Sequence, residues 1–270
     1  MNFMFQLAHT IDEIPKSDDW IYEIKEDGER IKAIKKGDRV ELWNRDRKTN
    51  RHRFEKSNVY PEVTEDLMIQ IHDFVIDGEV NCSDRTKGLD MFNRRALLSD
   101  QFKIRIMRGV IPVKFRVFDI LEINGKDVTD VPLILRKSIL DSFIEETENI
   151  EIVKYWFSDN VDELWDLVEK FKLEGIMAKR KVSPYVTNRT YSWLKIKNIK
   201  ETVVNIINYK ETSGQGSHGG LITDRCDVAL TTEQLRREYF AKKPTKARLR
   251  YYGVYPSGKL RNPVLLELIR

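Results

Sequence analysis

Cysteine is nearly absent from the sequence, since the 270 residues include only Cys82 and Cys226. Two thiols exclude a disulfide-rich scaffold and a cysteine-rich zinc site, and they suit a reducing compartment. The sequence also lacks a run of 18 apolar residues and a basic leader before an apolar segment. No candidate for a membrane span or a signal peptide follows from it. We therefore expect a cytoplasmic protein with no membrane partner.

A strong excess of one charge is absent from the chain as a whole but not from its C-terminal part. The formal net charge is +4. Residues 200–270 hold 13 Lys/Arg against 7 Asp/Glu, whereas residues 1–199 are slightly acidic. This asymmetry predicts a basic C-terminal unit that meets a polyanion.

Alternating apolar and polar residues predict strands in the N-terminal part. The segment from Trp20 to Trp43 alternates around an Asp-Gly and a Gly-Asp dipeptide, which predicts a meander of three strands. Lys25 stands at the end of the first of these strands. Helical and strand patterns then follow one another without an internal repeat.

The pattern of predicted elements changes near residue 199. Short strands with Gly-rich turns, such as SGQGSHGG at residues 213–220, surround one helical stretch. This pattern fits a small barrel of the oligonucleotide/oligosaccharide-binding (OB) type. We expect an α+β protein with a first domain of antiparallel sheets and flanking helices over residues 1–199. An OB-fold β-barrel is expected over residues 200–270.

The stretch KEDGER, from Lys25 to Arg30, raises the possibility of a reactive lysine. A lysine amine is a weak nucleophile while it is protonated, so neighbouring cations or a metal ion must lower its pKa. Lys195 and Lys197 share one face of a predicted strand because side chains repeat every two residues. They are candidates for that role if the strand lies beside Lys25.

A phosphate is the electrophile that suits an amine among cations. Phosphoryl-type transfer also uses a divalent metal ion held by carboxylates. Glu79 and Glu174 each stand beside a glycine at the end of a strand-like stretch, which makes them candidate ligands. Phe118 offers an aromatic face for a nucleobase.

These residues occur in a series of short ordered motifs. The motifs are KEDGER (25–30), WNRD (43–46), DGEV (77–80), FDIL (118–121), EGIMAK (174–179), WLKIKN (193–198) and LRNP (260–263). The series resembles that of ATP-dependent DNA ligases of the minimal phage or prophage type, which belong to the covalent nucleotidyltransferase superfamily, and the resemblance spans about residues 20–270.

The resemblance implies a three-step reaction that seals nicks in duplex DNA during repair, replication or recombination. Lys25 attacks the α-phosphate of ATP to form Lys25-AMP, the AMP moves to a DNA 5′-phosphate, and the 3′-OH displaces it. Glu23 reads the adenine amino group while Phe118 stacks on the ring. Glu79 and Glu174 hold Mg²⁺ or Mn²⁺, and nicked double-stranded DNA is the partner of a monomer. The other nucleotide contacts implied are Arg30, Arg45, Glu79, Arg189, Lys195, Lys197 and, on the β- and γ-phosphates, Arg261.

Two alternatives remain beside the DNA ligase. An RNA ligase or an RNA-capping-type nucleotidyltransferase would share the lysine-centred pocket. A non-enzymatic nucleic-acid-binding barrel would leave Lys25 without a role. In any of these, the basic run from Arg236 to Arg250, with seven Lys/Arg and one Glu, is a candidate for phosphate contacts.

Overall fold

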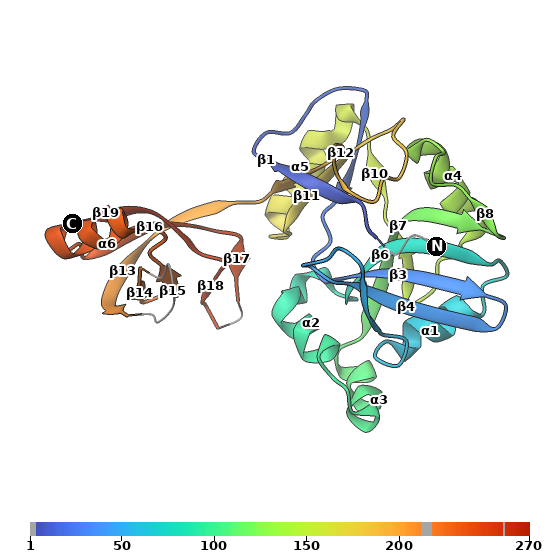
Figure 1. The fold of residues 1–270 in the computed structure, drawn as a ribbon, viewed down its shortest axis with the longest axis horizontal. Coiled ribbons are helices and arrows are strands. Elements are labelled where there is room, and N and C mark those ends of the chain that lie inside the picture. Colours follow the sequence, from blue (N-terminus) through green and yellow to red (C-terminus); the bar gives the residue numbers. More distant parts are fainter. Residues whose placement is uncertain (1–3, 212–217, 256) are drawn as a thin grey trace. The chain divides into compact units, whose positions relative to one another are not determined.

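The chain divides into two compact units, Met1–Lys197 and Asn198–Arg270, in the computed structural model (Figure 1). Residues 4–211, 218–255 and 257–270 are described. Most of the glycine-rich turn expected at residues 213–220 therefore lies outside the described residues. Both units combine helices with mainly antiparallel strands, which confirms the α+β class. None of the helices formed by the described residues is long and apolar enough to cross a membrane.

The first sheet of the N-terminal unit has five strands and one covering helix. Their bounds are β1 Leu7–Ile11, β2 Trp20–Ile24, β10 Tyr155–Trp156, α5 Val161–Lys170, β11 Gly175–Arg180 and β12 Arg189–Lys197. The order is β1-β12-β11-β2-β10, and all pairs except β1-β12 are antiparallel. Apolar residues three or four positions apart give α5 one buried face, formed by Val161, Leu164 and Val168. That face belongs to the same core cluster as Trp20 and Tyr22 of β2.

The second sheet of this unit has seven strands and lies against most of the helices. Its strands are β3 Glu29–Lys36, β4 Arg39–Arg45, β5 His52–Glu55, β6 Phe74–Cys82, β7 Val113–Ile123, β8 Lys126–Asp127 and β9 Ile150–Ile152. The helices are α1 Pro61–Met68, α2 Gly88–Ala96, α3 Gln101–Val110 and α4 Leu133–Phe143. The order is β5-β4-β3-β6-β7-β8, with β9 parallel to β7. The near-continuous burial of β6 and β7 places them at the centre of the largest core.

The predicted three-strand meander is wrong at its first turn. β2 pairs with β10 and β11, whereas β3 pairs with β4 and β6, so residues 25–28 connect two sheets instead of closing a hairpin. The reason is close packing of the connection on β6. A Cβ added to Gly28 would lie 2.0 Å from the carbonyl oxygen of Val80. Only glycine fits there, and Lys25 is thereby held where the two sheets meet.

The C-terminal unit is a small barrel-like arrangement of short strands with one helix. Its elements are β13 Lys200–Lys210, β14 Gly220–Thr223, β15 Asp227–Ala229, α6 Glu233–Lys242, β16 Lys246–Tyr251, β17 Gly253–Val254, β18 Leu260–Arg261 and β19 Val264–Ile269. The five-stranded sheet has the order β15-β14-β13-β16-β19, and β17 pairs with β18. The hydroxyl of Thr232 caps α6 by accepting from the backbone N–H of Leu235.

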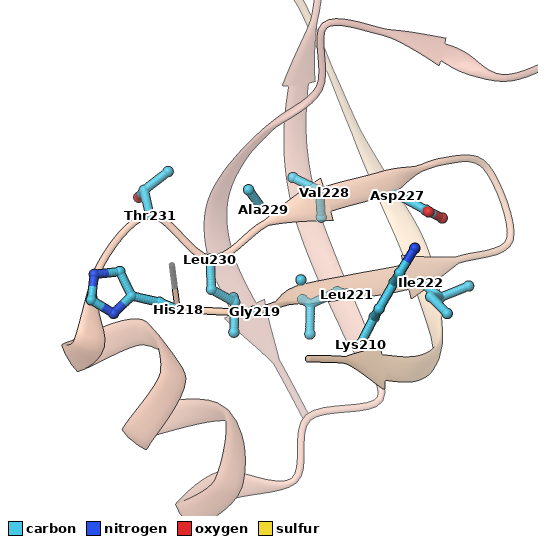
Figure 2. Close-up of a pocket in the computed structure, with 11 residues that line it drawn as sticks. Lys210, His218, Gly219, Leu221, Ile222, Asp227, Val228, Ala229, Leu230 and Thr231 are labelled. Atoms are coloured by element: carbon cyan, nitrogen blue, oxygen red, sulfur yellow. The ribbon is translucent and has the colours of Figure 1, made fainter. Parts of the chain in front are cut away.

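A pocket of ≈ 560 Å³ lies along the β14–β15 hairpin of the C-terminal unit (Figure 2). Lys210 and Asp227 stand toward one end of it, and His218 and Thr231 toward the other. Its lining contains none of the residues that the sequence predicts for the nucleotide.

Candidate active site

Lys25 lies just after β2, at the junction of the two sheets of the N-terminal unit. Its backbone N–H donates to the carbonyl oxygen of Gly175 over 2.9 Å. Its Nζ forms an ion pair with Glu174, and the two side chains are 18% and 12% exposed. The lysine is therefore anchored through its backbone, and its side chain remains partly exposed beside that of Glu174. We call the group of residues around these two side chains the recess.

A second carboxylate, Glu79 of β6, adjoins this pair. Its Oε1 accepts a hydrogen bond from the backbone N–H of Gly28 over 3.2 Å. Burial raises the pKa of Glu79 to about 8; Lys25 and Arg30 oppose the shift, and Glu174 adds to it. Burial thus favours the neutral form of Glu79 against the attraction of the two cations.

Burial and neighbouring carboxylates have opposite effects on the pKa of Lys25. Burial, the largest effect, lowers the pKa of Lys25, but Glu174, Glu79 and Asp27 together outweigh it and raise that pKa above its ordinary value. We expected Lys195 and Lys197 to lower this pKa; the repulsion between Lys25 and Lys195 is present, but the carboxylates outweigh it. Glu174 contacts the Nζ of Lys25 directly, and the raised pKa favours the ammonium form of the lysine.

The predicted cations of β12 form a row beside this recess. Lys195 and Lys197 stand opposite Met177 and Gly175 of β11, and Gly175 directly follows Glu174. Burial, then Lys197, Lys25 and Arg189, lower the pKa of Lys195. Arg189, at the start of β12, donates from Nη1 to the carbonyl oxygen of Ala8 over 2.5 Å. The positive charges of Lys195, Lys197 and Arg189 therefore lie close enough to affect one another, and such a group of cations suits a polyphosphate.

Arg30 of β3 is held by partners that the sequence did not reveal. It donates from Nε and Nη2 to the two carboxylate oxygens of buried Asp77 over 3.1 and 2.6 Å, and from Nη1 to the carbonyl oxygen of Gln6 over 2.6 Å. The hydroxyl of Tyr185 donates to the same Asp77 carboxylate. Burial first, and Arg30 second, lower the pKa of Arg45 on β4, which places the two arginines in one field.

Aromatic rings line the side of the recess that contains Phe118 of β7. Phe118 meets Trp193 edge to face, with centroids 5.9 Å apart at 80°. The Nζ of Lys179 lies 4.3 Å from the Phe118 centroid and 4.2 Å from that of Trp193. Met177 packs against the same cluster. A half-buried ring beside an aliphatic side chain is a suitable surface for a base.

Glu23 of β2 is enclosed more completely than its predicted role suggested. Its Oε1 lies 2.5 Å from the Nζ of Lys137 and its Oε2 lies 2.6 Å from the Nζ of Lys179. Lys179 ends the motif EGIMAK, so its importance could have been noticed in the sequence. Lys137 stands inside a predicted helix and gave no such signal.

Arg261 belongs to the C-terminal unit, where it lies on β18 opposite Gly253. The other predicted site residues all belong to the N-terminal unit. The structure therefore brings Lys25, Glu79, Glu174 and the β12 cations into one recess, with Arg30, Phe118 and Glu23 around it.

The carboxylates of Glu79 and Glu174 fit a divalent cation. Burial is the main cause of the raised pKa of Glu79 and the charge of Glu174 adds to it, and a bound divalent cation would favour the ionised form of both carboxylates. No group of three or more metal-ligating side chains occurs among residues 4–211, 218–255 and 257–270. Two carboxylates are enough for Mg²⁺, which usually keeps several waters and takes phosphate oxygens as its other ligands.

Comparison with known proteins shows the family of the chain. Residues 4–197 match the family model described as "ATP dependent DNA ligase domain". The chain belongs to the ATP-dependent DNA ligase family. A DNA ligase of Sulfophobococcus zilligii is 32% identical over 216 residues, which cover 73% of this chain and 34% of that protein. This ligase-family chain spans about a third of the length of the curated relatives it matches.

Solved ligase structures share the fold. A Lig E DNA ligase covers 99% of this chain and 100% of its own at a TM-score of 0.68 and 18% identity. The ligase domain of Mycobacterium tuberculosis LigD covers 99% of this chain and 97% of its own at a TM-score of 0.57 and 20% identity. The ligase fold, a nucleotidyltransferase domain with a C-terminal OB-fold, is thus the fold of this chain.

Proposed function

We propose that this chain is an ATP-dependent DNA ligase that seals nicks through a Lys25-AMP intermediate. The observation that carries the proposal is the placement of Lys25 at the junction of two sheets, paired with Glu174 and facing Glu79 and the cations of β12. A lysine in this setting meets a phosphate and a metal ion together.

The base of ATP is proposed to lie against Phe118. A carboxylate accepts hydrogen bonds only, so Glu23 suits the amino group of adenine and not the carbonyl of guanine. Lys195, Lys197 and Arg189 would then neutralise the α-phosphate and the ribose-phosphate. Arg30 and Arg45 would contact the ribose and phosphates from the other sheet.

In the first step, Lys25 loses a proton and its Nζ forms a bond to the α-phosphorus. The bond to the bridging oxygen breaks, and pyrophosphate leaves with the electron pair. A divalent cation competing for Glu174 would weaken the ion pair that holds Lys25 as an ammonium, and the cations of β12 would neutralise the phosphate oxygens. Mg²⁺ or Mn²⁺ bound by Glu79 and Glu174 would supply charge neutralisation of the phosphates. Arg261 is proposed to contact the β- and γ-phosphates.

In the later steps, a DNA 5′-phosphate oxygen attacks the phosphorus of Lys25-AMP and the lysine leaves. The neighbouring 3′-OH then attacks the 5′-phosphate and AMP leaves, which closes the phosphodiester. The Lys/Arg of the Arg236–Arg250 run are proposed to contact the duplex as part of a monomer. Replacing several of them should weaken nick binding and reduce its salt dependence, while Lys25-AMP formation stays near wild type.

The direct test is incubation of the protein with α-labelled ATP or GTP, followed by nick-sealing assays on DNA/DNA, DNA/RNA and RNA/RNA junctions. We expect covalent label from ATP alone and sealing of DNA nicks. Label from GTP would favour a capping-type enzyme, and preferential sealing of RNA would favour an RNA ligase. Absence of label from both nucleotides would contradict the proposal.

A further inference from the structure

Glu26, the residue after the proposed nucleophile, belongs to a buried cluster that the proposed reaction leaves unused. Its side chain accepts from Arg85 at Oε1, over 3.0 Å from Nε and 2.9 Å from Nη2. Its Oε2 accepts from Nδ2 of Asn81 over 2.9 Å. The residue is 8% exposed, and its partners Asn81 and Arg85 are not those of the Lys25 amine, which pairs with Glu174.

The cluster fixes Glu26 to the seven-stranded sheet. Arg85 lies in a single 3-10 turn, η1 (Arg85–Lys87), and also pairs with Glu151 of β9. Arg116 of β7 stands 3.8 Å from Glu26 and 3.6 Å from Glu151 through its Nε. It also donates to the carbonyl oxygens of Cys82 and Ser83. Every partner of Glu26 here is itself tied to β6, β7, β9 or the turn that follows β6.

The connection is therefore clamped from both sheets. Lys25 donates its backbone N–H to Gly175 of the five-stranded sheet, and Gly28 is packed on β6 of the other. The Cα atoms of Lys25 and Glu26 are about 3.8 Å apart across one planar peptide. Any shift of Glu26 is passed to the backbone that presents the lysine.

We propose that Arg85 is a positioning residue for Lys25, acting through Glu26. An arginine suits the task because its planar fork engages one carboxylate through two donors, which fixes orientation as well as distance. A misplacement of about 1 Å can slow an oriented reaction by about 10²-fold. The inference rests on the proposed function, because it concerns the rate at which Lys25 attacks ATP.

The test compares Arg85→Ala with the wild type in single-turnover formation of Lys25-AMP. We expect the maximal rate to fall by about 10- to 100-fold, with the concentration of ATP at half-maximal rate unchanged. Affinity for ATP measured in EDTA, where no transfer occurs, should also stay the same. Arg85→Lys should recover part of the rate. Because the Arg85 side chain is 27% exposed, millimolar guanidinium should restore part of the rate to Arg85→Ala.

Arg108→Ala is the matched control. Arg108 forms a fork with Glu65 on the surface of α1 and α3, and both side chains are well exposed. We expect wild-type labelling from it. If Arg85→Ala does not fold, Glu26→Gln keeps the shape of the cluster and should show the same loss of rate with unchanged affinity for ATP.

The outcomes separate the two hypotheses. If the wild type is labelled, and Arg85→Ala and Glu26→Gln are labelled at the same rate as the wild type, the positioning role is overturned. The proposed function is then unaffected. A loss of ATP affinity in proportion to rate, or no rescue by lysine or guanidinium, would also overturn it, since a merely structural residue would behave so. An unlabelled wild type would overturn the proposed function and this inference together.

Discussion

Two lysine–glutamate pairs in the N-terminal unit have the same chemistry in different surroundings. Lys25 and Glu174 are 18% and 12% exposed, whereas Lys179 and Glu23 are 1% and 2% exposed. Carboxylates outweigh burial at the first pair and raise the pKa of Lys25. At the second, burial first, and the charge of Lys137 in addition, lower the pKa of Lys179 to about 8.

The difference bears on the choice of nucleophile, because the lower pKa belongs to the more enclosed lysine. Lys179 loses its proton more readily than Lys25, yet its Nζ is enclosed by Glu23 and the rings of Phe118 and Trp193. Lys25 keeps its proton more firmly, yet its side chain is more exposed. Under the proposed function, this access and the neighbouring cations favour Lys25 as the nucleophile, and a divalent cation at Glu174 would weaken the ion pair that holds its proton.

The largest expected effect concerns Lys25, the lysine of the first pair. Lys25→Arg should lose all covalent labelling by ATP, because a guanidinium does not deprotonate at usable pH. Lys25→Ala should behave in the same way. Gel assay of labelled protein followed by peptide mapping measures this.

The variant compared with Lys25→Arg in that experiment is Lys179→Arg. It should still carry label, mapped to Lys25, even if the rate falls because the base-binding surface has changed. Acid-labile AMP on the Lys25→Arg protein would show that another lysine is the nucleophile, with Lys179 the first suspect.

The second prediction concerns folding stability at the two pairs. Glu23→Ala leaves Lys137 and Lys179 buried without their carboxylate and should lower the free energy of unfolding by about 3–5 kcal/mol. Glu174→Ala should change it by less than about 1 kcal/mol, since Lys25 keeps Glu79 and Asp27 as partners and can be hydrated. Urea unfolding of the two variants measures both values. Similar losses would mean that the two pairs do not differ in burial as described.

The sequence predicted the elements around Lys25 better than it predicted their connections. Alternation of apolar and polar residues located β2, β3 and β4 between Trp20 and Arg45, and the strand β12 that contains Lys195 and Lys197. The same reasoning misread residues 25–28 as a hairpin, because Asp-Gly is a strong local turn signal. The close approach of Gly28 to Val80 depends on contacts 52 residues apart in the chain.

The same division applies to the candidate site. Lys25, Glu79, Glu174 and the β12 lysines could be chosen because each has a chemical reason to stand near phosphate. Lys137 and Tyr185 could not, since they look like ordinary core or surface residues until the sheets are assembled. Asp77 and Lys179 stand in the motifs DGEV and EGIMAK, but the sequence did not show which residues they contact. Burial then sets the sign of each pKa shift, and burial is a property of tertiary packing.

The third prediction asks which step uses Arg261. Pyrophosphate leaves only in the first step, so a cation on its phosphates stabilises that transition state alone. We expect Arg261→Ala to form Lys25-AMP about 10²-fold more slowly, yet to seal a pre-adenylated nick at nearly the wild-type rate. Single-turnover kinetics on both substrates measure this. Equal losses would indicate a role in folding or DNA binding, and no loss in either would remove Arg261 from the site.

The smallest expected effect tests the contrast in pKa directly. Lys179 has a pKa of about 8 when folded and 10.5 when unfolded, so between these values the unfolded chain binds more protons than the folded one. Stability from this site must therefore rise with pH across that window. Lys179 and Lys137 share one carboxylate, so the proton lost belongs to the pair. The free energy of unfolding of wild type relative to Lys179→Met should increase by about 1–2 kcal/mol from pH 8 to pH 10.

For Lys25→Met the same difference should stay flat, because the raised pKa keeps Lys25 protonated when folded and the unfolded lysine is also mostly protonated there. Urea titrations at four pH values give both curves, and parallel slopes for the two variants would show that the two lysines are not electrostatically distinct.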